Sequence, residues 1–137
     1  MKTKLFILAM LLMPVMFGCS KDNETEKQIV GDWFMCYSKV YDSSADYDEE
    51  DTYTKETSNM FVSFYNDGTM KSSTNPDLGG SEQYVVNGTW SIEDGNLIMT
   101  YPEDGSESYS ISFESDNLFY LNTSEGAYSQ TLGFQRM

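Results

Sequence analysis

From residue 31 onward, apolar and polar residues alternate with a period of two, and short turn sequences interrupt the alternation. This pattern is typical of strands with one buried face, whereas the 3.6-residue period of an amphipathic helix is hard to find. We therefore predict an all-β domain of eight strands. They are expected near residues 31–41, 59–65, 69–73, 83–92, 97–101, 107–113, 118–123 and 127–136.

The predicted turns combine an acidic residue or Asn with a glycine, which adopts positive φ without strain. They are Asn66-Asp67-Gly68, Glu93-Asp94-Gly95-Asn96, Pro102-Glu103-Asp104-Gly105 and Ser124-Glu125-Gly126. Connections this short join antiparallel neighbours, because parallel strands need long crossovers. The chain is therefore expected to form an antiparallel meander.

One face of each predicted strand is apolar and the other is rich in Ser, Thr and Asn, as in Tyr109, Ile111 and Phe113 against the serines between them. Closing the sheet into an up-and-down barrel buries the apolar face and removes the free edges. Residues 118–123 carry large apolar groups on both faces and stay ambiguous. The set expected to point inward is Trp33, Met35, Tyr37, Met60, Val62, Phe64, Met70, Tyr84, Trp90, Met99, Tyr101, Phe113, Tyr120, Tyr128 and Phe134.

Charge and composition exclude several classes of function. The chain holds 22 Asp and Glu against 8 Lys and Arg, a net charge of −14, and it has no histidine. It cannot present the basic face that nucleic acids require, nor any relay that depends on imidazole. The acidic residues gather in turns and in one loop, where they are hydrated. We expect no catalytic residues and no cofactor, and no residue is assigned as a metal ligand.

The N-terminus has the pattern of a secretory signal. Lys2 and Lys4 precede an apolar run from Leu5 to Gly18, about 21 Å long as a helix and short of the ~30 Å hydrocarbon core of a membrane. Residues 1–18 are therefore predicted to be a cleaved signal peptide. The mature chain would then carry a charge near −16, since two of the eight basic residues are lost.

Met16-Phe17-Gly18-Cys19 resembles the bacterial lipobox, and Ser20-Lys21-Asp22-Asn23-Glu24 resembles the acidic export tag of Bacteroidota lipoproteins. The first resemblance implies that Cys19 carries acyl chains, and the second that the domain faces outward from the outer membrane. Residues 19–28 would form a polar tether between anchor and domain; on the alternative interpretation, the acidic residues only hold the domain off the bilayer. Cys36, the remaining cysteine, is expected to be a small apolar residue in a strand.

Four motifs resemble the lipocalin-like domains of Bacteroidota lipoproteins. They are Gly31-Asp32-Trp33, the hairpin Phe64–Thr69, the block Gly88–Leu97 and Phe134-Gln135-Arg136. The resemblance implies a lipocalin-like barrel over residues 29–137. It also implies that Trp33 lies across the closed end of the barrel, with Arg136 packed over its ring in a cation–π contact.

An eight-stranded barrel either fills its interior with side chains or holds one small ligand, and both outcomes stay open here. If there is a pocket, the candidate contacts are Met35, Tyr37, Phe64, Met99 and Tyr101. The expected function is then non-catalytic binding of a small hydrophobic or amphipathic molecule at the cell envelope.

The connection Tyr41–Ser58 is expected to lie over the open mouth, and it is strongly acidic. Its candidate residues are Asp46, Asp48, Glu49, Glu50 and Asp51. A mobile solvated loop, a calcium site and an acidic collar for a cationic partner are the three interpretations, although an EF-hand's glycine and terminal Glu are missing. The alternative function is therefore an inhibitor-like module that binds a cationic protein, or a structural subunit of a surface complex.

Overall fold

The computed structural model describes residues 22–74 and 84–137. A helix over residues 22–29 precedes nine strands. The strands are β1 (Gly31–Asp42), β2 (Tyr47–Thr52), β3 (Met60–Phe64), β4 (Thr69–Thr74), β5 (Val85–Glu93), β6 (Asn96–Tyr101), β7 (Gly105–Ser115), β8 (Leu118–Glu125) and β9 (Tyr128–Arg136).

The nine strands form one antiparallel sheet in the order β2-β1-β3-β4-β5-β6-β7-β8-β9, and an additional β1–β9 pairing closes it. Strands β1 and β3–β9 form the eight-stranded barrel, so the predicted up-and-down lipocalin-like barrel is confirmed. The expected glycine turns are also present, with positive φ at Gly68, Gly95, Gly105 and Gly126. At these four positions a glycine avoids the strain that a side chain would cause.

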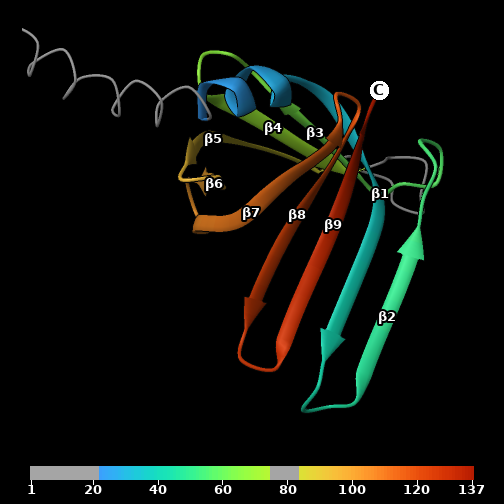
Figure 1. Cartoon of the computed structure of the whole chain (residues 1–137). Helices are drawn as coiled ribbons and strands as arrows, with labels where there is room; N and C mark the ends of the chain where they lie inside the picture. Colours follow the sequence, from blue (N-terminus) through green and yellow to red (C-terminus); the bar gives the residue numbers. More distant parts are fainter. Residues whose placement is uncertain (1–21, 75–83) are drawn as a thin grey trace, which may run out of the picture.

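The barrel splits along part of its length. The first residues of β1, Gly31–Phe34, pair with β3, whereas Tyr37–Asp42 pair with β2. Likewise β7 pairs with β6 up to Ser110 and with β8 from Ser110 onward. The far halves of β8, β9 and β1, together with β2, therefore run on as a four-stranded ribbon that leaves the wall formed by β3–β7 (Figure 1).

Strand β2 corrects the expectation of a mobile acidic loop. Asp48, Glu49, Glu50 and Asp51 lie on this strand, and Asp46 lies in the preceding turn with a φ of 50°. Every residue of β2 is exposed, so the strand lacks the alternation of apolar and polar residues by which strands are recognised in a sequence. Hydrogen bonding to β1, and not the burial of an apolar face, holds this segment as a strand.

A β-bulge interrupts β1 at Cys36. Met35 pairs with Phe134 and Tyr37 pairs with Gly133, which leaves Cys36 as the extra residue. Because side chains alternate between faces, one added residue reverses the orientation of everything after it. Cys36 itself is half-buried in the strand, where burial raises the pKa of its thiol.

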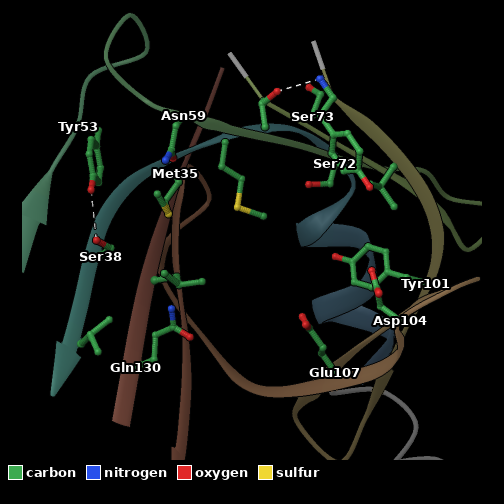
Figure 2. A pocket seen from close by; sticks show the side chains of 16 residues that line it. Met35, Ser38, Tyr53, Asn59, Ser72, Ser73, Tyr101, Asp104, Glu107 and Gln130 are labelled. Atoms are coloured by element: carbon green, nitrogen blue, oxygen red, sulfur yellow. Dashed lines mark hydrogen bonds between the residues drawn. The ribbon is translucent and has the colours of Figure 1, made fainter. Parts of the chain in front are cut away.

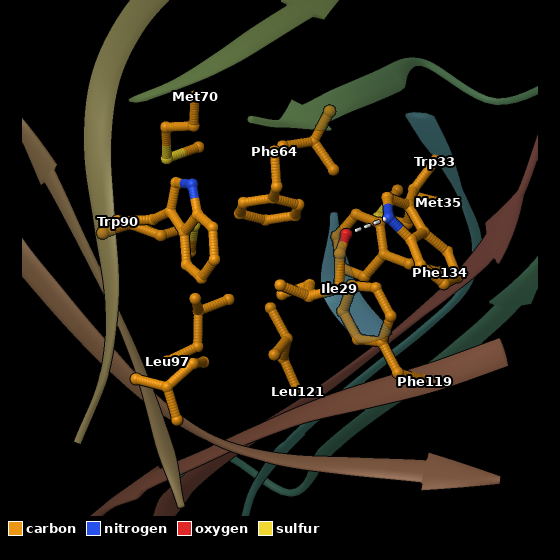
Figure 3. Packing of buried hydrophobic residues seen from close by; sticks show 13 residues of the cluster. Ile29, Trp33, Met35, Phe64, Met70, Trp90, Leu97, Phe119, Leu121 and Phe134 are labelled. Atoms are coloured by element: carbon orange, nitrogen blue, oxygen red, sulfur yellow. Dashed lines mark hydrogen bonds between the residues drawn. The ribbon is translucent and has the colours of Figure 1, made fainter. Parts of the chain in front are cut away.

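One end of the barrel is filled by aromatic and aliphatic side chains (Figure 3). Trp33 and Phe119 are fully buried, with ring centroids 4.6 Å apart in an edge-to-face arrangement. Phe119 also stacks on Phe134 at 5.2 Å. Ile29, at the end of the helix, is fully buried in the same cluster, and its carbonyl accepts a 2.7 Å hydrogen bond from the indole of Trp33.

Arg136 closes this end, as the family resemblance implies. Its Cζ lies 4.2 Å from the centre of the Trp33 ring, so the predicted cation–π contact is confirmed. The guanidinium also donates hydrogen bonds to the carbonyls of Gln28, Val30 and Asp116 at 2.8–3.1 Å. One side chain thereby joins the helix, the start of β1 and the β7–β8 turn.

The helix differs from the polar tether predicted over residues 19–28. The carboxylate of Asp22 accepts hydrogen bonds from the backbone N–H groups of Asp94 and Gly95, and Gln28 Nε2 donates to Asp116 Oδ1. These contacts and the burial of Ile29 fix the helix against the barrel, which a stretch of polar residues does not reveal in sequence. Residues 1–18 and Cys19 lie outside the described residues. Within the described part of the chain, no helix has the length and apolar character to cross a bilayer.

A candidate ligand cavity at the open end

An open cavity of about 570 Å³ lies where the four-stranded ribbon leaves the wall of β3–β7 (Figure 2). A pocket of this size is in the range used by small-molecule ligands. Its lining is contributed by the ribbon, by the wall and by the connections between them. The lining residues are Met35, Ser38, Val40, Tyr53, Asn59, Met60, Ser72, Ser73, Thr74, Tyr84, Val86, Tyr101, Asp104, Glu107, Gln130 and Leu132.

The inner part of the cavity is continuous with the hydrophobic core. Met35 belongs to the buried cluster, and Met60 and Leu132 pack against it while also lining the cavity. Thioether side chains adapt their shape to different neighbours, which suits a wall that contacts a ligand. An apolar group placed here would extend the core toward the mouth.

The outer part of the cavity is polar. The hydroxyls of Ser38 and Tyr53 lie 3.4 Å apart on one side, and Gln130 lies further along the same ribbon (Figure 2). Ser72 belongs to β4, in the wall opposite the ribbon, and Asn59 lies in the connection just before β3. These side chains can both donate and accept hydrogen bonds, so the mouth can accommodate a polar headgroup.

A negatively charged side faces these groups. Glu107 Oε2 accepts a 3.1 Å hydrogen bond from the hydroxyl of Tyr109, and Asp104 lies beside Tyr101 (Figure 2). Burial, and after it the charge of Glu107, raises the pKa of Tyr109 to about 12. Burial and the charges of Glu107 and Asp104 raise the pKa of Tyr101 as well.

The match of a family model decides the classification: the model described as a lipocalin-like domain covers residues 29–120. The chain belongs to the lipocalin-like domain family. No curated protein matches the sequence.

Two solved structures from Bacteroides share the fold of this lipocalin-like domain at low sequence identity. A lipocalin-like protein from Bacteroides uniformis gives a TM-score of 0.57 at 11% identity, and an uncharacterized protein from Bacteroides eggerthii gives 0.57 at 12%. Both alignments cover 80% of this chain and 99% of the other. A bovine lipocalin allergen gives a TM-score of 0.45 at 14% identity, covering 82% of this chain and 75% of the other. The lipocalin-like domain, as the family model defines it, is a fold typically used for binding and not for catalysis.

Two of the five predicted ligand contacts of this lipocalin-like domain, Met35 and Tyr101, line the cavity. Phe64 and Met99 point inward but are buried in the core, with 1% and 5% of their surfaces exposed. Met99 still touches the cavity wall indirectly, because the hydroxyl of Tyr101 lies 3.7 Å from its sulfur.

The inward orientation expected for Tyr37 is wrong. The bulge at Cys36 turns Tyr37 to the outer face, where its hydroxyl donates a 2.9 Å hydrogen bond to Glu50 and its ring packs edge-on against Tyr120. Tyr120 was also expected inside. The ambiguous strand β8 instead buries Phe119 and Leu121, so Tyr120 lies on the outer face.

Several cavity residues are missing from the sequence prediction. Ser38 and Val40 point inward only because of the bulge, which period-two counting does not detect. Glu107 and Gln130 could have been found, because each has the same parity as the apolar inward residues of its strand. A charged residue at an inward position of a barrel strand is the signal that would have revealed Glu107.

The acidic residues of β2 do not enter the cavity wall. Glu50 accepts a hydrogen bond from Tyr37, and Glu49 accepts one from Tyr47. In residues 22–74 and 84–137, no three Asp, Glu or Cys side chains converge into a metal-binding group.

Proposed function

We propose that this protein is a non-catalytic lipoprotein of the cell envelope that binds a small hydrophobic or amphipathic molecule in the cavity at its open end. The proposal includes acylation of Cys19 and anchorage to the outer membrane, with the domain facing the cell exterior. Two or three acyl chains would hold a domain of this size durably, at roughly 0.8 kcal/mol per buried methylene.

The cavity carries the proposal. It has about 570 Å³ of space, an inner wall of Met35, Met60 and Leu132, and a polar mouth. The combination of an apolar interior with a few polar groups at the entrance is the common form of a small-molecule site. The lipocalin-like fold supports the same conclusion.

Binding is tested with N-phenyl-1-naphthylamine, an uncharged apolar dye that fluoresces strongly away from water. We expect saturable fluorescence with the purified protein. Val86→Trp should abolish most of the signal, because Val86 lines the cavity and the larger ring would occupy it. Val85→Trp is the matched control, since Val85 is 41% exposed and lies on the other face of β5.

Absence of saturable dye binding to the unmodified protein would refute the proposed site. Equal dye binding by Val86→Trp and Val85→Trp would refute it too, because the dye would then lie elsewhere. Thermal unfolding of each variant checks that the barrel is intact.

The anchor is tested by expressing the full chain in a bacterium with lipoprotein-processing enzymes and labelling with an alkyne fatty acid. Cys19→Ser should remove the label and release the protein from the membrane fraction. Cys36→Ser is the control, and its label should persist. A label that survives Cys19→Ser would refute acylation at this residue.

Strand β2 favours a second candidate function, the binding of a cationic protein. It presents Asp48, Glu49, Glu50 and Asp51 on a fully exposed strand whose only strand partner among the described residues is β1. An edge strand of this kind offers free backbone groups for pairing, and its charge would speed association with a basic partner.

Lysozyme is a suitable cationic probe for this candidate. Binding at low salt should fall about tenfold in Asp48→Asn/Asp51→Asn and remain within twofold in Glu93→Gln/Glu125→Gln, which removes the same charge from other exposed positions. Lysozyme activity unchanged by excess protein would count against an inhibitor. Equal losses of lysozyme binding in both variants would mean that the net charge of the protein, and not the position of the carboxylates on β2, determines binding.

A further inference from the structure

The charged side chains that line the cavity all have the same sign. Asp104 and Glu107 are acidic, and no Lys or Arg belongs to the lining contributed by the described residues. The other polar groups there are hydroxyls and amides, which carry no charge. A ligand headgroup that enters the mouth therefore meets two carboxylates and no cation among the described lining residues.

Glu107 lies on β7 in the wall of the cavity and is exposed to solvent. It continues the inward row of β7 that holds Tyr109, Ile111 and Phe113, and its carboxylate is held by the hydroxyl of Tyr109 at 3.1 Å. Asp104 comes from the β6–β7 turn and lies on the same side of the cavity (Figure 2). The two carboxylates thus reach the mouth from the end of one hairpin.

Aromatic rings accompany these carboxylates. Tyr101 lies on the same side as the carboxylates, and Tyr53 lies on the other side of the cavity (Figure 2). Tyr84 also lines the cavity. A positive headgroup is attracted both by carboxylates and by the faces of aromatic rings. The raised pKa of Tyr101 agrees with a negative field, since after burial its causes are Glu107 and then Asp104.

We infer that the cavity selects cationic amphiphiles, with the apolar chain against Met35, Met60 and Leu132 and an amine headgroup beside Asp104 and Glu107. This inference rests on the proposed function, which it narrows to one class of ligand. A fatty acid is disfavoured, because its carboxylate would lie beside two others with no cation to offset the repulsion. A neutral alcohol of the same length should bind with intermediate affinity.

Three amphiphiles with one chain length test the headgroup: dodecylamine, 1-dodecanol and dodecanoate, each displacing N-phenyl-1-naphthylamine at pH 7 and low salt. We expect dodecylamine to bind at least tenfold more tightly than dodecanoate. The difference should shrink as salt is added, because the cavity is open to water.

Asp104→Asn/Glu107→Gln should weaken dodecylamine about tenfold and leave 1-dodecanol within twofold. Glu93→Gln/Glu125→Gln raises the net charge equally at exposed positions outside the cavity lining and should leave dodecylamine within twofold. This control separates the cavity carboxylates from the general attraction of an acidic protein for amines.

The inference would be overturned if the three amphiphiles bound equally, if dodecanoate bound best, or if none of them displaced a dye that does bind. It would also be overturned if both double variants lost the same affinity for dodecylamine. In each of these cases dye binding persists and the proposed function survives. Failure of the unmodified protein to bind the dye would instead remove the proposed function itself.

Discussion

The two ends of the barrel are made by the same strands and differ in what fills them. At the closed end, the inward residues of β1 and β9 are Trp33 and Phe134, both almost fully buried. At the open end, the inward residues of the same two strands are Ser38, Val40, Gln130 and Leu132. Large rings fill the interior at one end, and smaller or polar side chains leave it open at the other.

Each of these strands thus contributes packed rings at one end of the barrel and cavity lining at the other. Stability is concentrated where rings pack within 4.6–6.4 Å of each other, and space for a ligand is left where strands separate. Substitutions at the closed end should therefore change unfolding, whereas those at the open end should change binding. The predictions below test that separation, beginning with the largest effect.

A matched pair on β9 gives the sharpest contrast. Phe134→Ala removes a ring that is 2% exposed and stacked on Phe119, and it should cost about 3–5 kcal/mol in the free energy of unfolding. Leu132→Ala, two residues away on the same face, should cost only about 1 kcal/mol, because its side chain borders an existing cavity and is only partly buried. Urea denaturation measures both. Equal losses would mean that the open end stabilises the fold as much as the closed end.

Arg136→Met should cost about 2–3 kcal/mol, since it removes the contact with Trp33 and leaves the carbonyls of Gln28, Val30 and Asp116 without their charged donor. Arg136→Lys should recover less than half, because a lysine cannot donate in the planar fork of a guanidinium. Hydrogen exchange should show faster opening of residues 22–29 in both variants. A lysine variant as stable as the unmodified protein would show that charge alone suffices.

Gly133→Ala should cost about 1–2 kcal/mol through crowding on the outer face. A Cβ at this position would lie 2.9 Å from Tyr120 Cε1 and 2.9 Å from the Cβ of Tyr37. In a Tyr120→Ala background the cost should be smaller, since one of the two obstacles is gone. A double-mutant cycle by urea denaturation measures this coupling. Additive effects would contradict the packing described for Tyr37 and Tyr120.

The smallest expected effect concerns pH. The pKa of Tyr109 is raised to about 12 in the folded protein, above the ordinary value of 10, so the folded state holds this proton more tightly. The resulting stability is present below pH 10 and is lost as the pH rises toward 12. Glu107→Gln should lower the pKa of Tyr109, which tyrosinate absorbance at 295 nm would report. An unchanged titration would argue against the contact between Tyr109 and Glu107.

Much of the fold was predictable because its determinants are local. Glycine turns such as Gly68 and Gly95 need only a few residues to specify positive φ, and alternation in β5 and β6 reflects burial on one face. The pairing of Trp33 with Arg136 was predictable for a different reason. It came from resemblance to a family, since residues 103 positions apart in the sequence carry no local signal of contact.

The site was less predictable because it depends on long-range pairing. Strand β2 is ordered by β1 and not by an apolar face, so its sequence resembles that of a solvated loop. The orientation of Tyr37 depends on how Cys36 is accommodated opposite Phe134 and Gly133, which no period-two count includes. Glu107 could have been predicted from the sequence, because its inward position on β7 follows from that of Tyr109, two residues later.

The extra residue at Cys36 determines how much room the molecule has inside. If Cys36 instead paired with Gly133 as an ordinary strand residue, Tyr37 and Lys39 would take the inward positions that Ser38 and Val40 hold. A phenol ring would then occupy the interior, and an ammonium group would join a lining whose charged residues are Asp104 and Glu107 among the described ones. A single bulged amino acid thus keeps the open end hollow and acidic, while the aromatic packing of the closed end lies before it in the strand.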